Sequence, residues 1–187
     1  VSVNFDNTPY WVQYNREFNV DTTMLYIENE LDFSIARVRV GAKKFLVDLE
    51  GINQFDSSNN TSLTSDSDTL LSAGIVTPTA IDGLEVFAGY AENFAAIKDT
   101  VLERDSSALD EIEPETAENI DLGLRYVSDK LNASVTFYDV TFDNRLNFIA
   151  PDSPDGINYS IGNNGAYENV GGIESSGIEL SATWYIS

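Results

Sequence analysis

Apolar and polar residues alternate along residues 114–143, and this stretch carries the clearest structural signal in the chain. In its first half, apolar residues occupy every second position from Ile120 to Tyr126, and a second alternating run follows at residues 131–138. Residues 127–130, which separate the two runs, are short and polar enough for a tight turn. We therefore predict an antiparallel hairpin with one apolar and one polar face, and with strands long enough to cross a bilayer.

The same period of two recurs elsewhere in the chain. Apolar alternation bounded by turn-forming residues predicts a strand wherever it extends over several residues. With the two strands of the hairpin, these segments make about seven strands, the other five lying near residues 18–31, 35–49, 70–79, 84–94 and 177–186. The predicted fold class is all-β, an antiparallel sheet with up-and-down connections.

The connections between these strands alternate in length. Three are short, at residues 32–34, 80–83 and 127–130, and three are long and polar, at residues 50–69, 95–118 and 150–166. Outer-membrane barrels keep this order, with short periplasmic turns and long extracellular loops. Tyr126, Trp184 and Tyr185 stand near strand ends and fit an interfacial aromatic girdle. The pattern therefore favours a segment of a transmembrane β-barrel.

The polar face of the predicted sheet carries a line of cations. In a barrel this face would line the lumen, where a cation could contact an anionic solute. The candidate lumen-facing residues are Arg37, Arg39, Lys43 and Arg125. The more ordinary role for such residues is ion pairing within the wall, with Asp121, Glu179 or loop carboxylates as partners.

Three motifs in this order resemble the barrel of TonB-dependent outer-membrane receptors. The hairpin contributes Pro-Glu-Thr at residues 114–116, followed by Ile-Asp-Leu-Gly-Leu-Arg-Tyr and an aliphatic run that ends in Phe-Tyr-Asp. The segment Leu-Glu-Val-Phe-Ala-Gly-Tyr-Ala-Glu-Asn-Phe at residues 84–94 is similar to another strand of that family. Tyr-Glu-Asn-Val-Gly-Gly at 167–172, followed by Gly-Ile-Glu-Leu at 177–180, resembles a strand near the end of the barrel.

This resemblance implies both a location and a function. Residues 1–187 would form one segment of a receptor barrel, without a plug domain, in the outer membrane of a Gram-negative bacterium. The parent protein would take up a scarce solute, such as a siderophore, a cobalamin or an oligosaccharide, with energy from the TonB complex. Expected partners are outer-membrane lipid, the TonB complex acting through the plug, and a small-molecule or glycan ligand at the extracellular loops. The resemblance implies no catalysis and no cofactor.

Composition removes several other functions. The chain contains neither cysteine nor histidine, which excludes thiol chemistry and the Ser-His-Asp arrangement. A formal net charge of −21 argues against binding to nucleic-acid phosphates. The chain contains no run of about 18 apolar residues, so the sequence predicts no membrane-spanning helix. The sequence therefore predicts no catalytic residue and no metal site.

Two other folds are consistent with the alternation. One is a soluble, secreted, acidic β-sandwich that binds carbohydrate, with calcium held near Asp66 and Asp68. The other is a small closed barrel of eight strands. A sandwich would bury its apolar face against a second sheet, whereas a barrel wall leaves an apolar band about 25 Å tall facing lipid. Acidic residues such as Glu111, Glu113 and Glu115 could in principle supply a glycosidase pair, but their spacing in a loop favours solvated charges.

Overall fold

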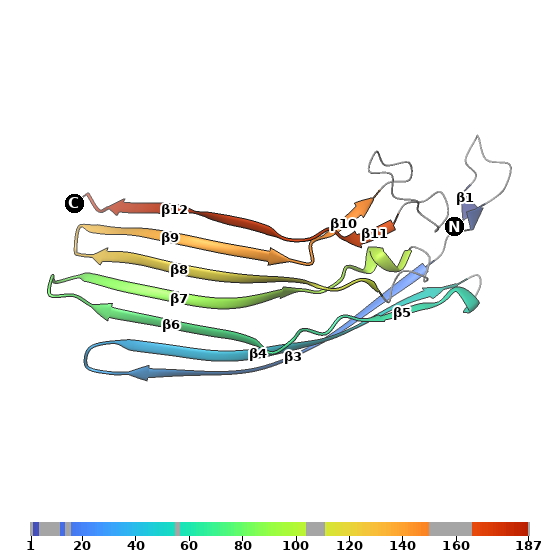
Figure 1. Cartoon of the computed structure of the whole chain (residues 1–187), viewed down its shortest axis with the longest axis horizontal. Helices are drawn as coiled ribbons and strands as arrows, with labels where there is room; N and C mark the ends of the chain where they lie inside the picture. Colours follow the sequence, from blue (N-terminus) through green and yellow to red (C-terminus); the bar gives the residue numbers. More distant parts are fainter. Residues whose placement is uncertain are drawn as a thin grey trace.

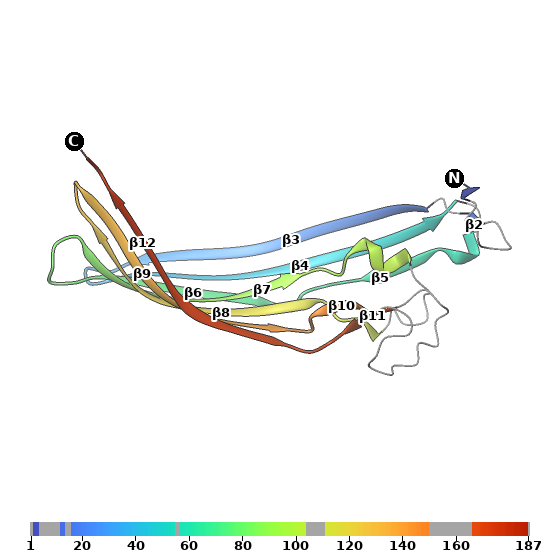
Figure 2. The same ribbon diagram turned by 90° about the horizontal axis from the view of Figure 1, so that it is seen from above.

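The computed structural model describes residues 2–3, 12–13, 16–54, 57–103, 111–149 and 166–186. Its main sheet is a single curved layer of long antiparallel strands (Figures 1 and 2). In spatial order these strands are β12 (Ile173–Trp184), β9 (Leu131–Asp143), β8 (Glu115–Val127), β7 (Leu84–Ala95), β6 (Leu70–Pro78), β4 (Arg37–Asn53) and β3 (Arg16–Asp32). The seven predicted strands and their up-and-down order are confirmed.

The remaining elements are short. Strand β5 (Thr61–Thr64) pairs with the outer part of β4, and β10 (Leu146–Ile149) pairs with β11 (Ala166–Asn169). A small hairpin joins β1 (Ser2–Val3) to β2 (Val12–Gln13). The described residues also include two 3-10 turns, η1 (Ser57–Asn59) and η2 (Asp99–Glu103). None of the helices in the described part of the chain is long and apolar enough to span a membrane.

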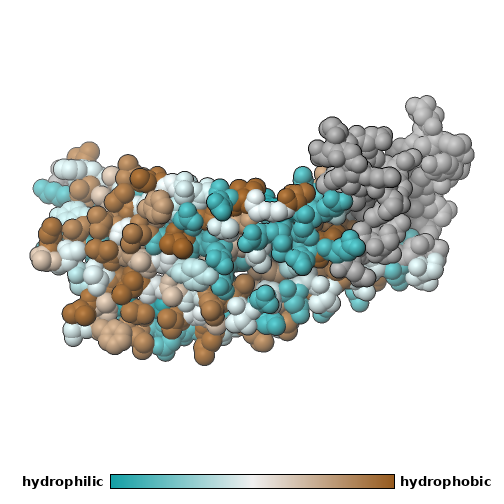
Figure 3. All heavy atoms as spheres, viewed as in Figure 1, coloured by the Kyte–Doolittle hydropathy of each residue, from teal (hydrophilic) through white to brown (hydrophobic). Residues whose placement is uncertain are grey.

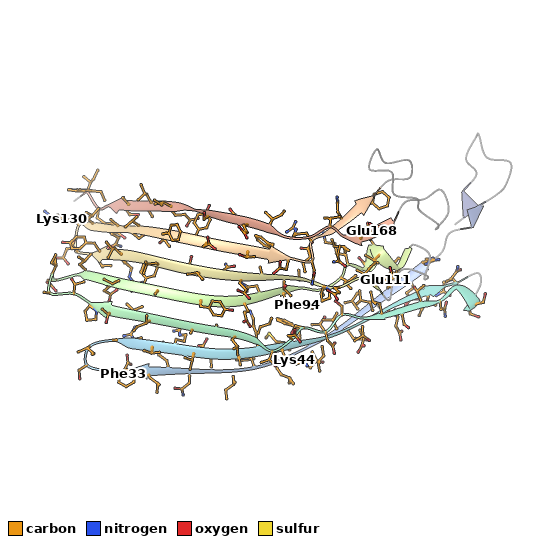
Figure 4. The ribbon with its side chains drawn as sticks, viewed as in Figure 1. Phe33, Lys44, Phe94, Glu111, Lys130 and Glu168 are labelled. Carbon is orange, nitrogen blue, oxygen red and sulfur yellow. The ribbon has the colours of Figure 1, made fainter. Side chains whose placement is uncertain are left out.

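Short and long connections lie at opposite ends of the sheet, as the sequence predicts (Figure 1). The short turns are residues 33–36, 79–83 and 128–130, and Phe33 and Lys130 mark their end of the sheet in Figure 4. In the turn before β7, Gly83 has a φ of +76°, and a Cβ there would collide with the carbonyl of Val127. Glycine is therefore required at this position.

Parts of the predicted long loops are ordered strand. β4 continues to Asn53 and is joined by β5, so residues 50–69 are not one irregular loop. The second strand of the predicted hairpin, β9, ends at Asp143, because Asn144 adopts a φ of +54° and breaks the extended backbone. β10 and β11 then form a separate hairpin. Most of the predicted loop 150–166 lies outside the described residues.

The apolar face of the sheet is uncovered at the short-turn half. Paired residues point to the same side of an antiparallel sheet, and the register places Ile120, Leu122 and Leu124 on one face with Phe137 and Val135. Leu122 is 53% exposed and Leu180, on β12, is 79% exposed. Figure 3 shows hydrophobic residues gathered over the short-turn half of the molecule. The described residues contain no second sheet over this face, so the sandwich alternative is wrong.

Candidate functional site

The two faces of the sheet exchange polarity part of the way along the strands. On the face that carries the apolar band, the band ends and charged residues follow, namely Lys44 on β4, Glu92 on β7, Glu118 on β8 and Asp139 on β9. On the opposite face the change is reversed, and Phe45 and its neighbours on β4 are apolar beyond Lys43. The outer face changes from apolar to charged residues because the strands extend out of the hydrocarbon layer into water. At about 3.3 Å per residue, the 17 residues of β4 extend about 56 Å, well beyond a band about 25 Å tall.

The polar face of the apolar half carries paired charges. Arg39 lies directly opposite Glu30 across β3 and β4, with its Nη2 2.6 Å from the Glu30 Oε2. One row further along, the Arg37 Nε donates to the Asp32 Oδ1 at 2.9 Å. On β8 and β7, the Arg125 Nη2 lies 2.5 Å from the Glu85 Oε2. All four predicted cations therefore belong to the face expected to line the lumen, and the three arginines are engaged in ion pairs.

The prediction for the partners of these cations is confirmed for one loop carboxylate, because Asp32 lies in the predicted connection 32–34 and pairs with Arg37, and it is wrong for the two named strand residues. Asp121 and Glu179 lie on the same polar face, but neither forms an ion pair with a described Arg or Lys. The arginines pair with the carboxylate directly across the adjacent strand or one register position away. Glu30 and Glu85 could not be identified as partners from the sequence, because strand register sets which residues face each other.

Lys43 differs from the three arginines. It is half-buried and lies directly opposite Tyr26, and none of the ion pairs among the described residues includes it. Its Nζ lies 6.0 Å from the centroid of the Phe45 ring. Beside it is a hollow of about 290 Å³, whose lining includes Met24, Tyr26 and Ser72.

The loop end holds a small apolar core on the polar side of β4. Residues from η2 and the segment before it pack onto the inner face of this strand, where Leu102 is fully buried. The buried members are Val47, Leu49, Ile97, Val101 and Leu102. The rings of Phe45 and Phe94 stack against this core with centroids 5.6 Å apart. This core explains why the inner face of β4 becomes apolar beyond Lys43.

The polar segment 65–68 connects β5 to the start of β6 and forms hydrogen bonds to β4 and to the segment before η2. The Asp66 Oδ1 accepts a hydrogen bond from the Val47 N–H at 3.0 Å, and the Ser67 Oγ accepts one from the Phe45 N–H at 2.9 Å. The Ser65 Oγ accepts a third from the Ile97 N–H at 3.0 Å. Asp66 thus has a structural role, and the described residues hold no cluster of three or more acidic side chains suited to a metal ion. The carboxylate at Glu115 accepts a hydrogen bond from the Leu146 N–H at 2.8 Å.

Aromatic residues stand at both edges of the apolar band. Tyr126 and Trp184 lie on the apolar face near the short turns, as predicted, and Tyr90 lies on the same face at the opposite edge. Tyr185 was expected in this girdle, but its hydroxyl accepts a hydrogen bond from the Asn132 Nδ2 at 3.1 Å on the polar face. It points inward because it is one residue out of phase with Trp184.

An apolar outer band, an inner face with paired charges, short turns at one end and long loops at the other define the wall of an outer-membrane β-barrel. The sequence matches the family described as TonB dependent receptor-like, beta-barrel, over residues 2–187. The chain belongs to this family, whose members are transporters of the Gram-negative outer membrane and not enzymes.

Solved structures agree on the fold. The FrpB iron transporter from Neisseria meningitidis (F3-3 variant) is 16% identical, with a TM-score of 0.66 over 93% of this chain and 25% of its own. The copper transporter OprC is 18% identical, with a TM-score of 0.69 over 98% of this chain and 29% of its own. The siderophore receptor PiuA from Acinetobacter baumannii is 17% identical, with a TM-score of 0.67 over 92% of this chain and 24% of its own. A comparison with curated proteins finds no match.

Proposed function

We propose that this chain is one section of the barrel wall of a receptor that takes up a scarce solute with energy from TonB. The change of the outer face from an apolar band to charged residues along the strands carries this proposal, because a barrel wall that passes from lipid into water on its outer side needs it. The chain spans about a quarter of the length of the structures compared with it. Under this proposal residues 1–187 form a single segment of the wall, and a plug in the rest of the receptor contacts TonB.

The solute classes that fit this proposal are a metal bound to a siderophore, a cobalamin and an oligosaccharide. The three similar structures are an iron transporter, a copper transporter and a siderophore receptor, which favours a metal or its chelate. The ordered loop end supplies a platform at the extracellular mouth, since η2 is fixed to β4 by the buried side chain of Leu102. The four lumen-facing cations would then line the path below it.

The placement of the wall is tested with single cysteines, because the chain contains no native cysteine. A spin label at Leu122→Cys should collide with oxygen, which concentrates in lipid, whereas a label at Asp121→Cys should not. These neighbours differ only in the face that they occupy. Equal oxygen access at both positions, or recovery of the receptor in the soluble fraction, would contradict the placement.

Transport is tested by accumulation of radiolabelled solutes in cells that contain the complete receptor. We expect one of the three solute classes to accumulate only when both the receptor and TonB are present. Accumulation that persists without TonB, or that none of the three classes shows, would contradict the proposed function.

A further inference from the structure

The inner face carries the four cations predicted from the sequence, and the structure separates one of these four from the others. Arg37, Arg39 and Arg125 each lie within 3.0 Å of a carboxylate oxygen, so their charges are compensated within the wall. Lys43 faces the same side of the sheet and has no carboxylate partner among the described residues. Its charge is therefore available to a group that approaches from the lumen.

The hollow beside Lys43 exists because the neighbouring wall residues are small. Gly41 and Ser72 lie opposite each other on β4 and β6 and form its floor. A Cβ on Gly41 would lie 2.8 Å from the Ser72 Oγ and 3.4 Å from the carbonyl oxygen of Ile27, so a larger residue at position 41 would occupy this space. Because Gly41 has no side chain, the hollow beside Lys43 remains unfilled.

Apolar and aromatic surface borders the same hollow. Tyr26 lies directly opposite Lys43, and Met24 lies two residues before it on the same face of β3. These side chains are 74% and 49% exposed, respectively. Glu28 also borders the hollow, and its Oε1 lies 3.7 Å from the Arg39 Nε, a guanidinium that Glu28 shares with the closer Glu30. A flat ring could therefore contact Tyr26 and Met24 while its acidic group reaches Lys43.

We propose that the hollow formed by Met24, Tyr26, Gly41, Lys43 and Ser72 binds an anionic aromatic group of the transported solute. The volume of about 290 Å³ is at the lower end for ligand pockets, so it suits one ring with its acid and not a whole solute. The site lies just below the apolar core at the loop end, where a solute that passes the loops would reach it. This assignment rests on the proposed function and adds a solute class to it.

The test uses 4-fluorobenzoate and its neutral amide, 4-fluorobenzamide, as probes of the complete receptor in lipid nanodiscs. Binding is followed by broadening of the fluorine NMR signal. We expect Lys43→Gln to weaken 4-fluorobenzoate binding about tenfold, the factor for one charge-assisted contact, and to leave 4-fluorobenzamide binding unchanged. Lys44→Gln is the matched control, because Lys44 is adjacent in sequence and lies on the opposite face.

A second variant tests the shape of the site and retains the charge of Lys43. Gly41→Val should weaken the binding of both probes, because its side chain enters the hollow. Failure of the wild-type receptor to bind 4-fluorobenzoate, or equal effects of the substitutions at Lys43 and Lys44, would overturn the assignment. Because this binding requires neither TonB nor transport, its failure is distinguishable from failure of the proposed function.

Discussion

Arg125 on β8 and Glu85 on β7 lie directly opposite each other on the inner face, and two guanidinium nitrogens contact one carboxylate oxygen. The Nε–Oε2 distance is 3.0 Å and the Nη2–Oε2 distance is 2.5 Å. The pair lies near the short turns, beside a hollow of about 570 Å³ whose lining includes Pro78 and Val127. Register alone brings these residues together across 40 positions in the chain.

This pair predicts a recoverable loss of stability. Glu85→Arg should destabilise the receptor, because two like charges would then face each other across adjacent strands. We expect a loss of about 1 kcal/mol in the free energy of unfolding, since both side chains are partly exposed. Adding Arg125→Glu should restore most of it. Urea unfolding in lipid vesicles measures both values, and no recovery in the double variant would show that the pair is not coupled.

Gly123 is expected to tolerate no side chain. It is buried under Phe87, and a Cβ at this position would lie 2.6 Å from the carbonyl oxygen of Val135 and collide with the Phe87 ring. Gly123→Ala should therefore cost about 1–3 kcal/mol of stability, as overpacking does. Gly89→Ala is the control, because its Cβ would meet nothing nearer than the Asp121 Cβ at 4.0 Å. Equal effects in thermal unfolding would contradict the packing described here.

A charged residue introduced on the outward face should lower the stability of the barrel wall. Leu122 points into the apolar band, and arginine near the middle of a bilayer costs about 2–4 kcal/mol in a barrel wall. Leu122→Arg should therefore lower stability by about this amount in unfolding measured in lipid vesicles. Asn119→Arg, on the same strand but on the inner face, should cost much less. If Asn119→Arg lowered the free energy of unfolding more than Leu122→Arg, the face of Asn119 would be the one that contacts lipid, which would contradict this assignment.

Asp66 should matter for the ordered loop end, and calcium should not. Asp66→Ala removes the acceptor for the Val47 N–H and should destabilise this region by about 1–3 kcal/mol, visible as faster hydrogen exchange at Val47. Asp68→Ala should have little effect, because the Ser67 hydroxyl donates to the backbone carbonyl of residue 68 at 2.7 Å. If calcium slowed exchange and both substitutions abolished that effect, a shared metal site would replace this interpretation.

The strands, their faces and the order of short and long connections could be predicted from the sequence alone. Alternation from Ile120 to Tyr126 is local information, because successive side chains on a strand point to opposite sides whatever lies beside them. The same logic placed Arg37, Arg39, Lys43 and Arg125 on one face before any partner was known. Outward Trp184 also follows from this period, whereas the inward Tyr185 was wrongly expected in the aromatic girdle.

Only the tertiary structure decided which of these residues meet. Glu85 and Arg125 are paired by register, and register depends on how several strands align together, which no single segment specifies. The apolar core around Leu102 was also hidden, because Phe45 and Val47 continue the phase of Lys43 but face a folded loop instead of the lumen. The isolation of Lys43 could be recognised only once the partners of the three arginines were fixed. Alternation is a property of neighbouring residues, whereas pairing and burial are properties of the assembled sheet.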